Sequence, residues 1–199
     1  MINHYRELCQ QWQTEFDRNR RLHGSRIHCR PGCSDCCGQL FQITEIEAGE
    51  VSRGFHNLPG SLQDRLRSRA AQYTLQREEL LASLGEIECW GSLPPPGARL
   101  ACPALEDGVC LIYEHRPLIC RKFGIPLWNP DTPGRVHACE LNFSPGEEID
   151  DPHLVQIQTD LRQQAKQLQA NYNAAALPRH ERPITVARAM IEDFSSVIP

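Results

Sequence analysis

Residues 29–37, CRPGCSDCC, place four thiols within nine residues of a 199-residue chain. Thiolates act as nucleophiles, as redox groups and as ligands of zinc and iron, so such a cluster predicts one of these chemistries or a set of disulfides. A second group of cysteines follows in a segment rich in Pro and Gly. The candidate metal ligands of the two groups are Cys29, Cys33, Cys36, Cys37, Cys102, Cys110, Cys120 and Cys139.

The sequence argues against a secreted disulfide scaffold. Its first residues, MINHYRELCQQWQTEF, lack the apolar run of ~7–15 residues that a secretory signal requires. No apolar run approaches the ~18 residues of a membrane span. The ten cysteines make up about 5% of the chain, below the ~8–10% typical of short disulfide scaffolds. We therefore expect a cytoplasmic protein whose reduced thiols bind metal or do chemistry.

Composition gives little indication of a partner. The 21 basic and 25 acidic residues leave a net charge of −4, and the pI is about 6.1. This balance gives no reason to expect nucleic acid or an anionic membrane. The expected partner is then a protein or a small molecule, which the sequence does not identify.

The spacing of the thiols bears on the metal. A single zinc ion usually takes four ligands, in pairs spaced by two to four residues. The neighbours Cys36 and Cys37 reach one small tetrahedral ion with difficulty, whereas an iron–sulfur cluster offers separated corners to thiolates. We therefore favour an iron–sulfur cluster of the 4Fe-4S type, with zinc as the alternative. Eight thiols are compatible with one centre or with two.

Charged and imidazole side chains near the cysteines are further candidates. Four thiolates around zinc or an oxidised 4Fe-4S cluster leave about two negative charges, which are costly to bury without cations. The cations expected to hydrogen bond to the sulfurs are Arg116 and Arg121, with Arg30 and Lys122 as weaker candidates. Histidines that could complete a mixed site are His28, His115 and His137.

Together the two motifs resemble a known family. The cluster at residues 29–37, followed by CLIYEHRPLICR at residues 110–121, is similar to the YkgJ-like CxxCxxCC cysteine-cluster family. The resemblance covers residues 29–140 and implies a metal-chelating domain, often described as an iron–sulfur protein. The chain departs from the family pattern in one place, since three residues rather than two separate Cys29 from Cys33.

Apolar spacing and capping signals predict helices on both sides of this region. Tyr5, Leu8, Cys9, Trp12 and Phe16 form one helical stripe, on which Cys9 is a small core residue. Further helices are expected over 33–37, from 45 through 51, from 62 onward and after residue 152. The last helix is expected after residue 185, with residues 187, 190, 191 and 194 on its buried face. The cap residues are Thr44 with Glu47, Ser61 with Asp64, Asp151 with Pro152, and Thr185.

The middle of the chain is expected to be irregular. Residues 91–103 are too rich in proline for a helix, and 109–113 are the one expected strand. Cys89 matches nothing in the family pattern and is expected to be a packing residue or a free thiol.

The predicted fold is therefore mainly α, a single domain over 1–199. Amphipathic helical flanks at 1–24 and 151–196 surround an irregular, metal-ordered Cys-rich region at 29–140 with little β structure. The predicted function is metal binding by a cysteine cluster, with a redox, sensing or substrate-activating role. The alternative is a zinc-stabilised structural or interaction module without catalysis. No catalytic residue is indicated, and whether the protein is an enzyme stays open.

Overall fold

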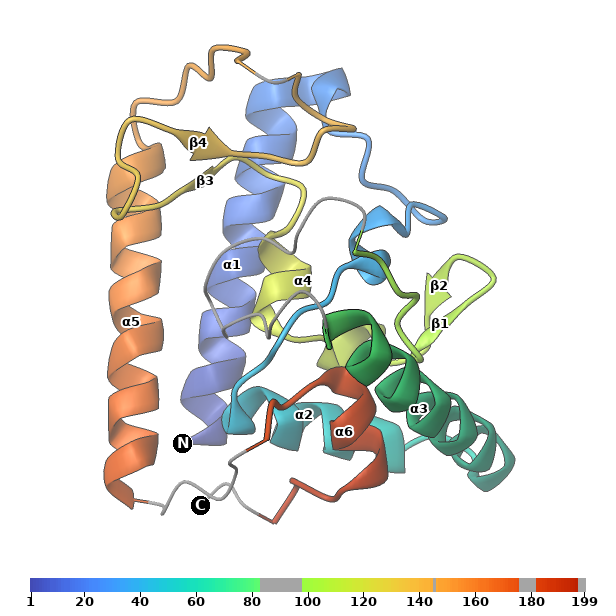
Figure 1. Cartoon of the computed structure of the whole chain (residues 1–199). Coiled ribbons are helices and arrows are strands. Elements are labelled where there is room, and N and C mark those ends of the chain that lie inside the picture. Colours follow the sequence, from blue (N-terminus) through green and yellow to red (C-terminus); the bar gives the residue numbers. More distant parts are fainter. Residues whose placement is uncertain (83–97, 145, 176–181, 197–199) are drawn as a thin grey trace. The chain divides into compact units, whose positions relative to one another are not determined.

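A computed structural model describes residues 1–82, 98–144, 146–175 and 182–196 of the chain (Figure 1). The fold is mainly α, as predicted, with four strands of two residues each in the described residues. The chain divides into two compact units. Unit 1 comprises Met1–Cys33 and Leu118–Ala175, and unit 2 comprises Ser34–Pro117 and Ala176–Pro199. The single-domain organisation stays a prediction.

Unit 1 is built on the long helices α1 (Ile2–His23) and α5 (Leu154–Ala175), with the short helix α4 (Leu118–Lys122). Both α4 and α5 pack against α1 (Figure 1). The predicted stripe of α1 is confirmed, because Tyr5, Leu8, Cys9 and Trp12 are buried. Cys9 is 5% exposed and belongs to the core, as predicted. Phe16 is only half-buried.

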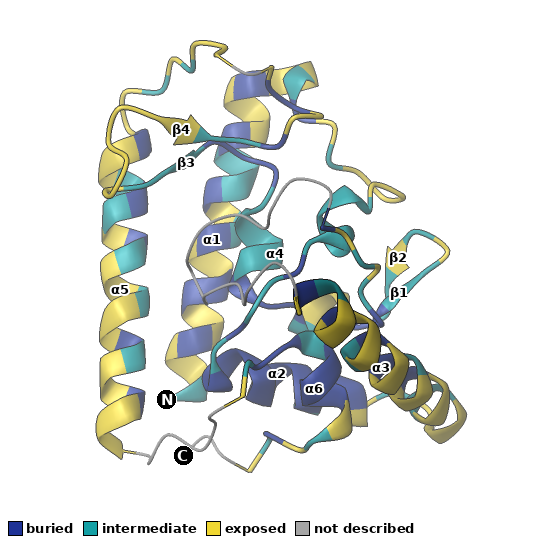
Figure 2. Cartoon of the chain, viewed as in Figure 1, coloured by how far each residue is buried: buried dark blue, intermediate teal, exposed yellow. Residues whose placement is uncertain are grey.

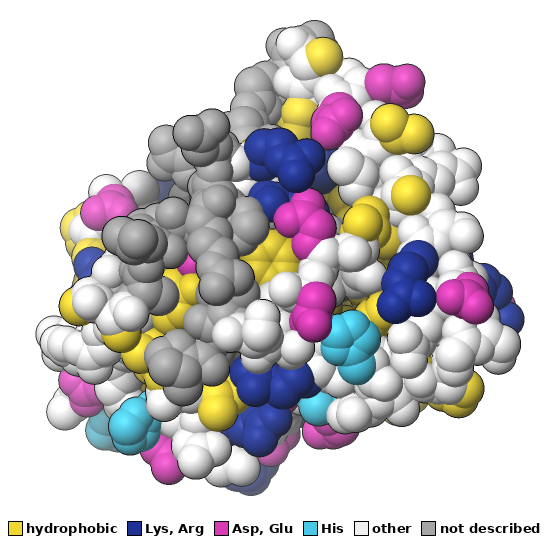
Figure 3. Space-filling view, turned by 90° about the horizontal axis from the view of Figure 1, so that it is seen from below, with side chains coloured by type: hydrophobic (Ala, Val, Ile, Leu, Met, Phe, Trp, Pro, Cys, Tyr) yellow, Lys and Arg dark blue, Asp and Glu magenta, His cyan; other side chains and the backbone are white. Residues whose placement is uncertain are grey.

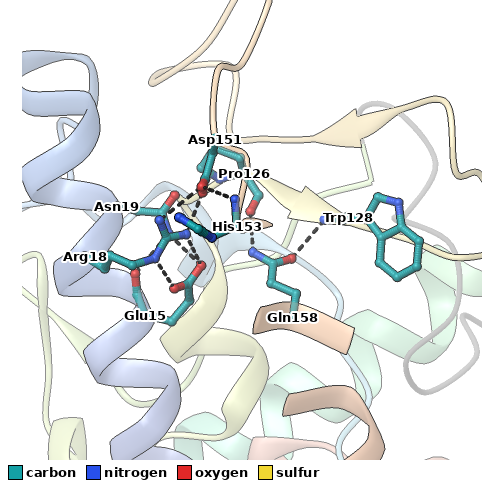
Figure 4. Close-up of polar contacts among 8 residues, drawn as sticks. All are labelled: Glu15, Arg18, Asn19, Pro126, Trp128, Asp151, His153 and Gln158. Carbon is teal, nitrogen blue, oxygen red and sulfur yellow. Dashed lines mark hydrogen bonds and ion pairs between the residues drawn. The ribbon is translucent and has the colours of Figure 1, made fainter. Parts of the chain in front are cut away.

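A polar network joins α1 to the start of α5 (Figure 4). The guanidinium of Arg18 donates to both carboxylate oxygens of Glu15, at 2.6 and 2.9 Å, and to both of Asp151, at 2.5 and 3.1 Å. Charge-assisted bidentate pairs of this kind are the strongest hydrogen bonds that side chains make. Asn19 donates to Glu15 Oε1 at 2.8 Å and holds that carboxylate in place. Asp151 also accepts from the His153 amide, but α5 begins at Leu154, two residues later than the cap predicted at Asp151 implies.

Side chains of α5 also fix the segment that follows α4. Gln158 donates to the Pro126 carbonyl at 2.8 Å and accepts from the Trp128 amide at 2.9 Å (Figure 4). Arg162 donates to the Trp128 carbonyl at 2.9 Å. Trp128 lies in β3 (Leu127–Trp128), which pairs antiparallel with β4 (Val136–His137). Because Gln158 is fully buried, its amide supplies bonds that water cannot.

Unit 2 contains α2 (Glu45–His56), α3 (Gly60–Leu81) and α6 (Val186–Ile191). Helix α6 packs against both α2 and α3, and α2 is buried over most of its surface (Figure 2). The predicted capping box is confirmed, since Thr44 and Glu47 exchange side-chain and backbone hydrogen bonds. The cap at Thr185 is also confirmed, because its hydroxyl accepts from the Arg188 amide.

Three expectations about helices are wrong. Pro59, not Ser61, caps α3, which begins two residues earlier than expected and makes no side-chain cap bond. Ile191 is 44% exposed rather than on the buried face of α6, because the helix ends there. No α-helix covers residues 33–37, where the structure instead has a 3₁₀ helix over Asp35–Gly38.

Other features concern the surface and the undescribed residues. In the view of Figure 3, Lys and Arg side chains are interspersed with Asp and Glu. Within the described ranges, no helix is both long and apolar enough to cross a bilayer. Cys89 and most of the expected irregular segment 91–103 lie outside the described residues.

Candidate metal centre

In unit 2, backbone hydrogen bonds join the first cysteine group to the second. The Leu100 amide donates to the Gly38 carbonyl at 2.9 Å, and the Cys102 amide donates to the Cys37 carbonyl at 2.7 Å. Gln39 and Arg99 form an antiparallel bridge in the same ladder. These hydrogen bonds join two segments 65 residues apart in the sequence and place Cys37 beside Cys102.

A β-hairpin then brings Cys110 to the same place. Strand β1 (Leu105–Glu106) pairs with β2 (Val109–Cys110), with Leu105 opposite Cys110. The connecting residues Asp107 and Gly108 have φ of 49° and 76°, the left-handed conformations of a two-residue hairpin turn. The expected strand over 109–113 is thus only partly right, because regular pairing stops at Cys110. The Leu105 amide also donates to the Cys102 carbonyl at 3.0 Å, which closes the loop onto Cys102.

The four described cysteines of unit 2, which we call set 2, interact electrostatically. Set 2 comprises Cys36, Cys37, Cys102 and Cys110. The hydrogen bond from Cys36, helped by the charge of Arg116, lowers the pKa of Cys37 to about 7 against the effect of burial. Burial raises the pKa of Cys102 to about 12, and the charges of Cys110 and Cys37 act in the same direction. Burial likewise raises the pKa of Cys110. Because metal ligands are thiolates, binding a metal here must release protons.

Arg116, one of the two cations predicted to compensate the thiolates, lies in the same unit as set 2. It is buried at 8% exposure, and its charge acts on both Cys37 and Cys110. Its guanidinium lies over the ring of Tyr113, 3.6 Å from the ring centroid. A stacked, buried guanidinium loses part of its hydration, so its charge acts more strongly on nearby sulfur than an exposed cation would.

Helix α2 anchors the segment that carries Arg116. His115 Nδ1 lies 2.8 Å from Glu50 Oε1, and Glu50 is a buried residue of α2. Gly54, one turn further along α2, leaves room for the imidazole, because a Cβ there would lie 2.4 Å from His115 Cγ. Glu50 and Gly54 of α2 thus fix the position of the His115 imidazole, and its role as a ligand stays a prediction.

Arg99 is a site residue that the sequence analysis missed. Its guanidinium donates to the Asp35 carbonyl at 2.5 Å and to Asp35 Oδ1 at 2.8 Å. It also lies against Gly38, where a Cβ would come within 2.9 Å of Nη2. Arg99 thus ties the turn that carries Cys36 and Cys37 to the segment that carries Cys102. No spacing rule connects residues 35 and 99, so no sequence signal pointed to it.

In unit 1 a tight turn brings Cys29 and Cys33 together. The Cys33 amide donates to the Arg30 carbonyl at 2.9 Å, across the Pro31-Gly32 turn expected from the sequence. The two thiols share a side-chain hydrogen bond. Burial raises the pKa of Cys29, while a hydrogen bond from Asn142 and the charge of Arg20 on α1 oppose that change.

Asn142, also missed by the sequence analysis, links three segments around Cys29. Its side-chain nitrogen donates to Cys29 Sγ at 3.4 Å and to the Gly124 carbonyl at 2.5 Å. Its side-chain oxygen accepts from the His28 amide at 2.9 Å. Gly124 has φ of 106°, and a Cβ there would lie 2.5 Å from Cys29 Sγ. Only glycine therefore combines this backbone conformation with so close an approach to the sulfur.

Two further candidate ligands, Cys120 and Cys139, also belong to unit 1. Cys120 lies in α4, four residues before Gly124. The buried Cys139 begins a turn. Its carbonyl accepts hydrogen bonds from the amides of Asn142 and Phe143, at 2.9 and 3.0 Å. We call the four cysteines of this neighbourhood set 1, namely Cys29, Cys33, Cys120 and Cys139. Arg121 follows Cys120 in α4, so the two predicted cations fall in different units.

The remaining predicted candidates are placed as follows. His137 lies in β4, with Nε2 3.3 Å from Thr132 Oγ1, and the exposed His28 contributes its backbone amide to Asn142. Lys122 lies over the Trp12 ring at 5.6 Å, and Arg30 is exposed in the turn before Cys33. None of the nine described cysteines is in a disulfide. Among the described residues, no three His, Cys, Asp or Glu side chains are arranged to hold a single metal ion.

Comparison with known proteins gives one result. A family model described as "Putative zinc- or iron-chelating domain" matches residues 28–140. No curated protein and no solved structure gives a significant match. The matched range contains all eight cysteines of sets 1 and 2.

Proposed function

Because the chain belongs to the CxxCxxCC family, whose model spans more than half of its residues, we propose that its clustered thiols hold an iron–sulfur cluster of the 4Fe-4S type. The observation that carries this proposal is set 2. Its four thiols come from segments far apart in the sequence, yet backbone hydrogen bonds and a hairpin hold them in one compact unit. No other feature of the described structure explains why the chain would collect four half-buried thiols there.

The residue types present suit such a group, although no three of the described His, Cys, Asp or Glu side chains already surround a single point. Thiolate is the usual ligand of iron–sulfur clusters, and four thiolates complete a 4Fe-4S cluster. The adjacent residues Cys36 and Cys37 suit separate corners of a cluster better than one small ion. Arg116 supplies buried positive charge beside the sulfurs, which offsets the negative charge that such a centre carries.

The role that this arrangement supports best is electron transfer or the sensing of oxidants. The thiols of set 2 are half-buried rather than sealed in the core. A centre at that depth is accessible to a redox partner or to a small oxidant, while solvent exposure and nearby charge tune its potential. Such a role requires the reduced thiols of a cytoplasmic protein, which is part of the proposal.

The second candidate is a zinc-stabilised structural module. Between residues 98 and 117 the regular structure consists of two-residue strands and a three-residue 3₁₀ helix, so a zinc ion would add much to its stability. In that case the protein would serve as an interaction module, and the metal would have no redox role.

Anaerobic purification followed by elemental analysis and a visible spectrum separates the two candidates. The proposal predicts a brown protein with iron and acid-labile sulfide in equal amounts. The Cys36→Ser and Cys37→Ser variants should lose metal, whereas Cys9→Ala, which changes a core cysteine outside both sets, should retain it. A colourless protein with stoichiometric zinc would overturn the iron proposal in favour of the module. Purification of a folded chain with no metal would overturn both.

A further inference from the structure

The eight described cysteines of the matched range divide equally between the two compact units. Set 1 lies in unit 1 and set 2 in unit 2. Four thiolates are enough to complete either a tetrahedral zinc site or a 4Fe-4S cluster. The division passes between Cys33 and Ser34, so Cys33 and Cys36 fall in different units although they are three residues apart.

Contacts within unit 2 bring members of set 2 together. Cys37 and Cys102 are neighbours through the backbone bond between them, and Cys110 joins through its pairing with Leu105. The elements that hold these segments, α2 through Glu50 and the Arg99–Asp35 pair, also belong to unit 2. These contacts around set 2 therefore lie within its own unit.

Contacts within unit 1 assemble the surroundings of set 1 in a different way. Asn142 connects Cys29 to the carbonyl of Gly124 and lies in the turn begun by Cys139. The segment after Gly124 is fixed in turn by Gln158 of α5, which bonds to Pro126 and Trp128. The start of α5 is held to α1 by the Arg18 network (Figure 4). These residues all belong to unit 1.

Set 1 also shows two signs of a site built around sulfur. The backbone of Gly124 approaches Cys29 Sγ so closely that a Cβ would overlap it. The buried Asn142 directs an N–H at the same sulfur, and such N–H···S bonds stabilise thiolate ligands of metal centres.

We propose that the chain holds two separate thiol-ligated centres, set 1 in unit 1 and set 2 in unit 2, rather than one centre shared by all the cysteines. This inference rests on the proposed function, because it assigns the ligands and the number of the centres that the function requires. Asn142 is then a positioning residue of the first centre and Arg116 a charge-compensating residue of the second. Cys33 and Cys36 are ligands of different centres.

Two double variants of the full chain test this proposal. Cys120→Ser with Cys139→Ser removes half of set 1, and Cys102→Ser with Cys110→Ser removes half of set 2, while Cys9→Ala is the control. Iron, sulfide and zinc are quantified per chain after anaerobic purification, and electron paramagnetic resonance is recorded after reduction by dithionite. With two 4Fe-4S clusters the parent chain carries about eight irons. Each double variant should keep about half of the iron. Its electron paramagnetic resonance spectrum should show only one of the two distinct signals of the parent chain.

Other outcomes overturn the inference in recognisable ways. If either double variant loses all of the metal, the centres are not independent, and a single shared centre explains the result. If one double variant loses all and the other none, only one unit binds metal. A parent chain with two zinc ions and no iron would contradict the iron–sulfur function but not the two-centre inference, which each variant would then test by losing one zinc. A parent chain without metal would overturn both.

A second comparison covers the case in which a double variant does not fold. The single variants Cys33→Ser and Cys36→Ser change neighbouring thiols that the proposal assigns to different centres. The first should alter only one of the two resonance signals and the second only the other, while hydrogen exchange reports which unit loosens. Loss of the same signal in both variants would refute the assignment.

Discussion

Unit 1 and unit 2 gather their thiols by different means. In unit 2 backbone hydrogen bonds bring the thiols together, in a ladder between residues 37–39 and 99–102 and in the hairpin that ends at Cys110. In unit 1 the side chain of Asn142 positions Cys29, and Gly124 leaves room for its sulfur. Backbone bonds can form with almost any side chain, whereas the arrangement in unit 1 depends on the identity of single residues.

This difference affects how each set responds to change. The thiols of set 2 already influence one another, since the pKa values of Cys37, Cys102 and Cys110 each reflect their neighbours. Substitutions near set 2 should therefore act mainly through the lost thiolate. Substitutions near set 1 should act through lost positioning even when all of the thiols remain.

The largest effect is expected from Cys37→Ser in unit 2. Cys37 has the lowered pKa of its set, so it supplies a thiolate near neutral pH, and a serine hydroxyl does not replace it. Loss of the centre should lower the free energy of unfolding by more than about 4 kcal/mol. Urea unfolding and metal analysis measure both effects. The control Cys9→Ala should cost about 1 kcal/mol and leave metal content unchanged, and a metal-replete Cys37→Ser would contradict the ligand role.

In unit 1 the sharpest test of positioning is Gly124→Ala, which leaves every thiol in place. The new Cβ meets Cys29 Sγ and forces a left-handed backbone on alanine, at a cost of about 2–4 kcal/mol. Gly146→Ala is a matched control, since Gly146 has φ of 81° but open space around it, and should cost about 1 kcal/mol. Equal losses of stability in the two variants would mean that the sulfur contact is unimportant.

The scaffold of unit 1 should respond to pH through Asp151. Burial opposes its ionisation, but the hydrogen bonds from Arg18 and the His153 amide outweigh burial and lower the pKa of the carboxyl. The folded state thus favours the carboxylate, and this stabilisation is complete above the unfolded value near about 4. It is lost as the pH falls from there through the folded pKa.

Asp151→Asn should accordingly destabilise the chain by about 1–3 kcal/mol at pH 7, and its difference from the parent chain should shrink below pH ~4. Urea titrations across this range provide the measurement. Asp160→Asn, on the exposed face of the same helix, is the control and should match the parent at every pH. A difference that stays constant with pH would show that the ion pair does not hold α1 to α5.

The smallest effects are expected at helix starts in unit 2. Thr44→Ala removes a capping box and should cost about 1 kcal/mol. Ser61→Ala changes an exposed residue that makes no cap bond and should be neutral within about 0.5 kcal/mol. Thermal unfolding of both variants checks this. Equal destabilisation would restore the Ser61 cap that the sequence predicted.

Local signals in the sequence predicted much of the scaffold. Three features were predicted correctly, namely the stripe on α1, the capping box at Thr44 and the cap at Thr185. Each depends only on residues close together in the sequence, so residue spacing was enough to predict it. The cap predicted at Ser61 is wrong because α3 already begins at Gly60, with Pro59 as its N-cap, so Ser61 lies inside the helix. The helix expected over 33–37 is not formed, because a turn closed by the Cys33 amide and the Arg30 carbonyl ends at Cys33 and only a short 3₁₀ helix follows from Asp35.

The site itself was harder to predict, because its contacts are long-range. The dipeptide Asp107-Gly108 is a strong hairpin signal that would have paired Leu105 with Cys110. Nothing local, by contrast, links Arg99 to Asp35 or Asn142 to Cys29, since these partners meet only in the folded chain. The ligand set and the number of centres therefore stay predictions from the sequence and proposals from the structure.

X-ray absorption at the iron and zinc edges of the anaerobically purified chain tests the central claim most directly. The account predicts iron surrounded by sulfur alone, with a second shell of iron neighbours, and no stoichiometric zinc. A metal surrounded by nitrogen or oxygen, or a folded chain whose cysteines are paired as disulfides with no metal bound, would contradict it.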